Sequence, residues 1–359
     1  MHSRTNLNVA LSEEVSSDES EISLSKEDLR LAAAYEAPSL ARSLWQFVST
    51  FALFGLAVAA MAWSLSGPYL YTVLLGVLAG GLLLRIFIIQ HDCGHGSFFE
   101  SRELNDYVGS FCSLFTLIPY FYWRRQHAIH HASNGNLDHR GHGDMDISTV
   151  AEYQALSKFG KLRYRVYRNP IMFLLFGPIF FVLFINRFAF DHEKTSPKER
   201  RNVHLTNATM ILAYLALSLA FGWMTVLKIA FPLIYTAAAG GIWLFYIQHQ
   251  FEHTYWRWDD EWDYVTAAMQ GSSFYKLPKI LQWLTGSIGY HHIHHLKPNI
   301  PNYLLQRCHE ENPEFQRVVT ITLWSSLQTM FLSLWDEERK RLISFREYAR
   351  HYGNRQALQ

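Results

Sequence analysis

Two long apolar stretches constrain the fold of this chain more than any other feature. Residues 44–65 carry no charge, and residues 69–89 carry only Arg85 near their end. As helices rising about 1.5 Å per residue, they would be roughly 30 Å long, which is the thickness of the hydrocarbon core of a bilayer. Neither stretch has the polar face that a helix of a soluble core would show. Ser66-Gly67-Pro68 forms a turn between them, so we predict a transmembrane hairpin.

The other apolar stretches differ in length. Residues 206–222 and 224–247 are separated by little more than Gly222-Trp223, and they predict a second hairpin. Residues 107–123 are shorter and end in a proline and aromatic residues, a pattern typical of the membrane interface. Residues 171–190 are apolar with a proline inside. We expect 107–123 and 171–190 to be interfacial, the latter lying in the interface or re-entering.

Histidine is unusually frequent, with 18 residues, and it is clustered. Spacings of i, i+3 and i+4 place side chains on one face of a helix. Imidazole is the commonest nitrogen ligand for iron, zinc and copper. These spacings occur three times: at His91 and His95; at His127, His130 and His131; and at His291, His294 and His295. Their repetition argues against a chance surface patch and predicts a metal site.

Further histidines stand outside these clusters. His249 and His253 have i, i+4 spacing at the end of the second hairpin. His139 and His142 stand in a polar, glycine-rich loop, and we expect neither to be a ligand. The same loop offers side chains that could orient ligand histidines through their second ring nitrogen, among them Asn134 and Asp138.

Three clusters can form one site only if they lie on the same side of the membrane. If all three apolar stretches between the second and third clusters crossed the membrane, the odd number of crossings would place these clusters on opposite sides. The basic residues of 194–201 and Arg124-Arg125 are typical of cytoplasmic segments. We therefore predict an all-α integral membrane protein. Its four transmembrane helices form two hairpins, its termini are cytoplasmic, and a histidine-rich cap faces the cytoplasm.

The number of imidazoles exceeds the needs of one metal ion, since a mononuclear site uses three or four protein ligands. Two ions would use all of them. Nitrogen ligation with open positions suits iron that activates oxygen. A site at the membrane surface suits a long apolar substrate that enters from the lipid.

The clusters and their flanks resemble a known family. They are His91-Asp92-Cys93-Gly94-His95, His127-Ala128-Ile129-His130-His131 and His291-His292-Ile293-His294-His295. Their order and their positions relative to two hairpins are similar to the three histidine boxes of membrane fatty acid desaturases, over residues 40–310. The flanks, including Ser97-Phe98-Phe99 and Pro298-Asn299-Ile300-Pro301-Asn302-Tyr303, most resemble the acyl-lipid Δ12 (ω-6) branch.

This resemblance implies an O2-dependent enzyme that introduces a cis double bond into a long acyl chain of a membrane lipid. It implies two non-haem iron ions and two electrons from ferredoxin or a similar carrier. No His-Pro-Gly-Gly motif of a fused haem donor occurs. The implied ligands are His91, His95, His127, His130, His131, His291, His294 and His295, with His249 as an additional ligand. His253 is the alternative to His249, or an outer group that orients ligands, as Asp92, Asn134 and Asp138 are expected to be. His292 falls at a variable position.

We expect the membrane domain, which holds all the candidate ligands, to span residues 39–310. Residues 1–38 are polar and acidic and predict a disordered extension, with a short amphipathic helix over 24–37 that ends at Pro38. We expect the residues after 310 to have a packing role and no chemistry. Residues 311–359 are an amphipathic cytoplasmic segment with apolar residues at helical spacing from Trp324 to Leu334. A net charge of +1 gives no indication of a nucleic-acid partner, and the three distant cysteines predict no disulfide scaffold.

Other functions remain open at this point. A hydroxylase, a ketolase or an epoxygenase on the same scaffold would share every ligand. A membrane haem electron carrier would need isolated histidines facing each other within the spans, and a metal transporter would need polar ligands at mid-membrane depth. We expect a desaturase in the inner (plasma) membrane of a cell.

Overall fold

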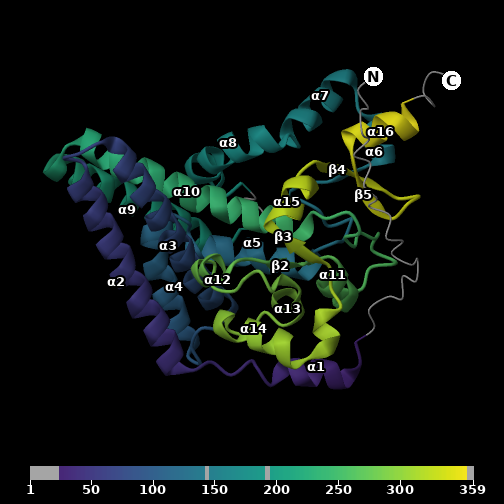
Figure 1. Ribbon diagram of the computed structural model, residues 1–359, viewed down its shortest axis with the longest axis horizontal. Coiled ribbons are helices and arrows are strands. Elements are labelled where there is room, and N and C mark those ends of the chain that lie inside the picture. The colour runs from purple at the N-terminus through teal and green to yellow at the C-terminus, as the bar shows by residue number, and fades with distance from the viewer. Residues whose placement is uncertain (1–23, 142–144, 191–194, 354–359) are drawn as a thin grey trace, which may run out of the picture.

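The computed structural model describes residues 24–141, 145–190 and 195–353, and it is mostly helical (Figure 1). Within these residues, four helices are long and apolar enough to cross a membrane. They are α2 (Leu40–Ser64), α3 (Tyr69–His95), α9 (Pro197–Phe221) and α10 (Trp223–His249). Each contains one of the predicted apolar stretches. In Figure 1 they occupy the side of the molecule opposite the small strands.

Two of these helices, α3 and α10, continue beyond the ends of the predicted apolar stretches and include candidate metal ligands. α3 continues past residue 89 to His95, so that the first histidine cluster forms its last two turns. Gly96 then ends it in the left-handed conformation, with φ of 73°, which glycine adopts without strain. α10 likewise ends at His249. Two of the four apolar helices therefore deliver histidines directly from their C-terminal ends.

α3 is the central helix of this group, and it packs against both α2 and α10. Its contact with α10 is close because glycines stand at the crossing. A methyl group added at Gly80 would lie 2.6 Å from Cβ of Thr236 and 2.9 Å from the carbonyl oxygen of Leu233. The two backbones could not approach so closely with a larger residue at this position.

The two shorter apolar segments are both broken. Residues 107–123 cover the end of α4 (Arg102–Thr116) and the start of α5 (Tyr120–Ser133), which are separated at Leu117, where φ is 61°. Residues 171–190 contain most of α8 (Pro170–Phe180) and a π-helical turn over Phe181–Ile185. α8 is bent by 73° from the preceding helix, α7 (Lys158–Tyr167).

The remaining helices are short and lie mostly around the third histidine cluster. They are α6 (Val150–Ala155), α11 (Tyr264–Gln270), α12 (Lys279–Leu284), α13 (His291–Leu296), α14 (Asn302–Glu311), a 3-10 turn over Pro313–Gln316, α15 (Leu323–Thr329) and α16 (Phe345–Tyr352). The predicted helix before Pro38 is present as α1 (Lys26–Ala33). It lies beside α14, where the Tyr35 hydroxyl donates a hydrogen bond to Glu311. Residues 1–23 of the predicted extension, together with His142 and Lys194, lie outside the described residues.

The prediction of an all-α protein was wrong in the C-terminal part. β1 (Ser148–Thr149) pairs in parallel with β4 (Leu332–Asp336), which pairs antiparallel with β5 (Arg341–Ser344). β2 (Phe274–Lys276) and β3 (Thr320–Thr322) form a second, parallel pair. The helical spacing from Trp324 to Leu334 was misleading, because Trp324 is exposed on α15 while Leu334 is buried in β4. Short apolar runs do not distinguish a buried strand from a helix.

The close crossing of α3 and α10 gives a first prediction. Gly80→Ala should lower the free energy of unfolding by about 1–3 kcal/mol, because the added methyl overpacks the crossing. Gly55→Ala on α2 is the matched control, since a methyl there would meet no atom within 4 Å. Thermal unfolding of the detergent-solubilised variants would measure the difference. Equal stability of the two variants would contradict the proposed packing constraint.

Candidate metal centre

Nine histidines from four separate helices, α3, α5, α10 and α13, converge at the ends of α3 and α10. They form two groups in which the ring nitrogens offered as ligands lie within 4.8 Å of one another. The first group consists of His91, His95, His127, His131 and His294. The second consists of His130, His249, His291 and His295.

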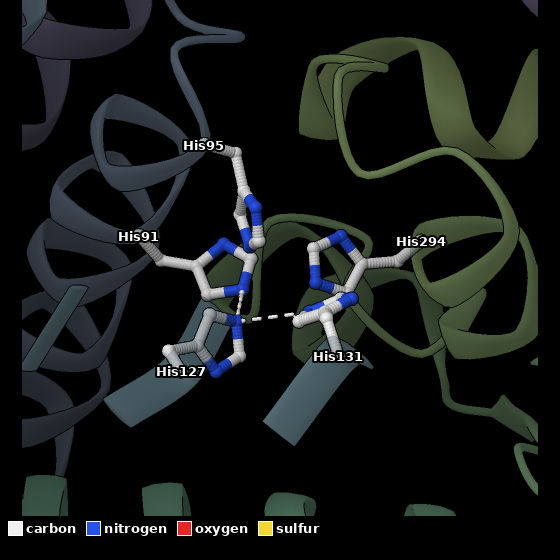
Figure 2. A group of neighbouring side chains, drawn as sticks. All are labelled: His91, His95, His127, His131 and His294. Atoms are coloured by element: carbon white, nitrogen blue, oxygen red, sulfur yellow. Dashed lines mark hydrogen bonds between the residues drawn. The ribbon is translucent and has the colours of Figure 1, made fainter. Parts of the chain in front are cut away.

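The first group surrounds a small central space, toward which its five rings turn (Figure 2). Two rings come from the last turns of α3, two from α5 and one from α13. Nε2 of His127 lies 3.0 Å from Nε2 of His91 and 3.1 Å from Nε2 of His131. These segments are up to two hundred residues apart in the sequence and meet only through the tertiary fold.

The second group is built in the same way from α5, α10 and α13. Nε2 of His291 lies 3.0 Å from Nε2 of His249 and 3.2 Å from Nε2 of His295. His130 completes this group. The two groups are adjacent, because the rings of His131 and His295 stack with their centroids 4.1 Å apart.

The i, i+3, i+4 spacing divides its residues between the two groups. On α5, His127 and His131 belong to the first group and His130 to the second. On α13 the arrangement is reversed, because His291 and His295 belong to the second group and His294 to the first. Each short helix thus contributes an i, i+4 pair to one group and the intervening residue to the other.

The nitrogen positions fit metal ions. Two nitrogens at right angles about an ion, each ~2.1 Å from it, would lie about 3.0 Å apart, close to the shortest distances in both groups. Nε2 of His95 and Nε2 of His294 are buried and have no hydrogen-bond partner among the described residues. Buried polar atoms without a partner are costly, and a cation would satisfy them.

The protonation state also fits. Burial, and then the neighbouring imidazoles, hold the pKa of His127, His131 and His294 well below the ordinary value. The same causes lower the pKa of His291 and His295. These rings are therefore neutral at physiological pH, which is the form of imidazole that binds a metal.

The buried carboxylate of Asp92, which was predicted to orient a ligand, contacts the ring of His91. Oδ1 of Asp92 lies 3.1 Å from Nδ1 of His91, so that Nε2 of His91 is left to face the group. Oδ2 of Asp92 accepts hydrogen bonds from the backbone N–H of Asn302 at 2.7 Å and from its side-chain amide at 2.8 Å. Gln46 of α2 in turn donates to Oδ1 of Asn302 at 3.2 Å. All four residues are buried.

Sequence analysis missed Asn302 and Gln46. Asn302 stands in the flank after the third cluster, and this flank was used only for the family resemblance. Its position gave an indication, since it follows a proline and begins a helix, α14. Gln46 is a polar residue within the first apolar stretch, which was an indication of a buried polar contact.

His249 is held through its other ring nitrogen. Nδ1 of His249 lies 2.9 Å from the carbonyl oxygen of Gly271 and 3.5 Å from the Ser272 hydroxyl. Asn134 approaches the same hydroxyl, with its amide nitrogen 3.5 Å away. Asn134 therefore reaches a ligand candidate through Ser272 rather than directly.

The other predicted residues lie away from the two groups. His253 is exposed and belongs to neither, so of the two alternatives the geometry places His249 in the site. Asp138 was predicted to orient a ligand; instead, its carboxylate accepts a hydrogen bond from the backbone of Asp259, 2.9 Å away. His139 is exposed and lies 3.6 Å from Asp259. His292 is buried and faces His309, with 3.2 Å between Nε2 and Nδ1.

A family model described as fatty acid desaturase matches residues 66–325, which include all nine histidines. The chain belongs to the fatty acid desaturase family. It is therefore an oxidoreductase, and this membership removes the haem carrier and the metal transporter from the alternatives.

Individual members of the family are similar over most of the chain. A Bacillus subtilis protein named fatty acid desaturase is 47% identical over 322 residues, which cover 89% of this desaturase and 91% of the relative. A Synechocystis sn-1 acyl-lipid omega-3 desaturase (ferredoxin) is 28% identical over 324 residues, covering 83% and 82%. An Arabidopsis thaliana acyl-lipid omega-3 desaturase (cytochrome b5) is 30% identical over 243 residues, covering 63% and 59%.

The two groups lead to a prediction about metal content. The purified desaturase should contain about two iron ions per chain. His131→Ala should lower iron binding in the first group and His295→Ala in the second, as measured by elemental analysis. His139→Ala is the control, since His139 lies outside both groups, and it should retain the iron content of the parent. One zinc and no iron in the parent desaturase would contradict the assignment.

The contact between Asp92 and Asn302 leads to a prediction about the affinity for iron. Asn302→Ala should weaken iron binding by about tenfold, the lower end of what loss of an orienting group costs. Competition with a chelator of known affinity would measure this. Asn312→Ala is a matched control, since it removes a buried asparagine from the other end of α14. Its amide donates hydrogen bonds to the carbonyl oxygen of Cys308 at 2.7 Å and to the Tyr35 hydroxyl at 3.4 Å, and within the described part of the chain it makes no hydrogen bond to the nine histidines. A similar loss in both variants would show a general effect of packing instead.

Proposed function

We propose that this desaturase uses two non-haem iron ions held by nine histidines, five in the first group and four in the second. The observation that supports this most directly is the convergence of nine imidazoles, eight of them buried, on two adjacent points. Five and four imidazoles leave at least one open position on each octahedral ion, where oxygen could bind. The ions would supply activation of O2 for the removal of hydrogen from two neighbouring methylenes of an acyl chain.

The overall reaction fixes what else the site needs. The acyl chain loses two hydrogens and gains a double bond, while O2 becomes two waters. Two of the four electrons come from the acyl chain, and the other two come with two protons from outside. A separate electron carrier must therefore dock. The names of the relatives, which include ferredoxin and cytochrome b5, support a small carrier of this kind.

The arrangement of the helices supports a cytoplasmic site. The C-terminal ends of α3 and α10 meet at the histidines, and the N-terminal part of α9 lies nearby, where Asn202 accepts a hydrogen bond from the backbone of Phe121 on α5. This side carries the basic residues Lys198, Arg200 and Arg201. We place α2 with α3, and α9 with α10, as two hairpins across the inner (plasma) membrane, with the histidines and both termini on the cytoplasmic side.

The substrate is proposed to be a long acyl chain in a membrane lipid. The flanks of the histidine clusters support a Δ12 (ω-6) position for the new double bond. Relatives named omega-3 desaturases support instead an ω-3 position, three carbons nearer the methyl end than ω-6. The position of the double bond depends on how the acyl chain lies relative to the metal site. The same nine histidines would serve a double bond at either position.

One experiment tests both the reaction and its position. The desaturase would be expressed in a host that lacks polyunsaturated lipids, and the extracted acyl chains would be analysed for the location of new double bonds. We expect a new cis double bond at Δ12. His130→Ala should form no product, and it should insert into the membrane normally because His130 is not part of a span. His139→Ala should retain the activity of the parent.

Each outcome has a separate meaning. A double bond at another position would overturn the Δ12 assignment alone. A hydroxylated, epoxidised or ketonic product would replace the desaturation by a related oxidation on the same ligands.

A further inference from the structure

Helix α7 has an exposed apolar stripe that no other described element covers. Phe159, Leu162 and Val166 stand at i, i+3 and i+7, and they are 75%, 59% and 51% exposed. These three positions fall on one side of a helix. An apolar stripe of this kind in water is unfavourable, so it indicates a partner surface.

Basic residues border this stripe on both sides. At 100° per residue, Lys158 lies beside Leu162 on one edge and Arg163 lies beside Phe159 on the other, and both are exposed. The opposite side of α7 packs on the protein, where the buried Tyr164 hydroxyl donates a hydrogen bond to the carbonyl oxygen of Ser333 at 2.7 Å. Residues 158–185 contain no aspartate or glutamate. This surface therefore consists of an apolar stripe bordered only by positive charges.

The stripe continues onto helix α8. Ile171, Leu175 and Phe176 are each at least half exposed, and no charged residue lies between Asn169 and Ile185. α8 runs beside the C-terminal half of α10, where the rings of Phe173 and Tyr246 are 5.0 Å apart. Exposed apolar side chains thus occur on both α7 and α8, and α8 packs against a predicted membrane span.

The 73° bend between α7 and α8 suits a helix that turns from the hydrocarbon into the plane of the membrane surface. Arg168 holds the bend in place. Its buried guanidinium donates hydrogen bonds to Oε1 of Gln250 at 2.6 Å and to the carbonyl oxygen of Leu332 at 3.0 Å. The direction of α7 relative to α10 is therefore set by internal contacts.

We propose that α7 lies flat on the membrane surface and binds anionic lipid headgroups through Lys158 and Arg163. Phe159, Leu162 and Val166 enter the boundary between headgroups and acyl chains, as in other basic amphipathic helices. This inference goes beyond the proposed function, and it rests on the proposed placement of the four spans in a membrane. A lipid surface fits better than a protein partner, because α7 leads directly into the exposed apolar helix α8, which packs against a predicted membrane span.

The expected preference for anionic lipid can be stated as a ratio. About 1 kcal/mol for each basic residue near an anionic surface corresponds to roughly thirtyfold for Lys158 and Arg163 together. Lys161 and Arg165 are instead engaged with Tyr153, since Arg165 donates a hydrogen bond to its hydroxyl at 2.7 Å and Nζ of Lys161 lies 5.8 Å from the centre of its ring. They are therefore not expected to add to this preference.

The test uses the full chain in lipid nanodiscs of phosphatidylcholine, with or without phosphatidylglycerol. Single cysteines at Leu162→Cys, Leu215→Cys and Glu338→Cys would carry a spin label, and the three native cysteines are buried. Accessibility to oxygen reports the membrane, and accessibility to a nickel chelate reports water. Leu215 is exposed on α9 and reports whether the spans are embedded, whereas Glu338 is exposed beside β4 and serves as the water control.

With phosphatidylglycerol present, we expect the label at 162 to be shielded from nickel like the label at 215. The double replacement Lys158→Glu, Arg163→Glu should restore access of nickel to 162. Access at 162 in both lipids, with 215 shielded, would overturn the inference for α7. Equal shielding in both lipids, unchanged by charge reversal, would overturn the anionic preference. Access of nickel at 215 would show instead that the proposed membrane placement fails.

Discussion

The structure depends on holding nine imidazole rings together, out of water, at the meeting point of helices from opposite ends of the chain. Buried ring nitrogens 3.0–3.2 Å apart are unfavourable by themselves, because each loses its hydrogen bonds to water. A cation between them removes this cost. The fold must therefore be stable enough to keep the rings in place, and the close crossing of α3 with α10 serves that purpose.

Much of this arrangement could be predicted from the sequence of residues 44–295. The apolar stretches located all four long helices, since length and lack of charge are unambiguous over twenty residues. The three clusters contained eight of the nine converging histidines. The family resemblance implied an additional ligand, for which His249 was preferred to His253. The division into five and four was beyond prediction, because it depends on how α5 and α13 face each other across the site.

The residues and strands that the sequence analysis did not predict depend on contacts between distant parts of the chain. Gln46, Asp92 and Asn302 lie in three segments, and only the tertiary fold brings them into one hydrogen-bonded chain behind His91. The strands β4 and β5 were missed for a related reason. Their short apolar runs become strands because they pair with each other and cover aromatic residues of α6 and α7, contacts between distant parts of the sequence.

The shared use of α5 and α13 links the two halves of the centre thermodynamically. Because each helix supplies residues to both groups, an ion bound in one group would restrain the helices that present ligands to the other. Any entropic cost of holding α5 and α13 in these positions would then arise mainly at the first binding event. Loading should thus be positively cooperative, and chains with a single ion should be scarce at partial saturation. By reciprocity, loss of either ion lowers the affinity for the other.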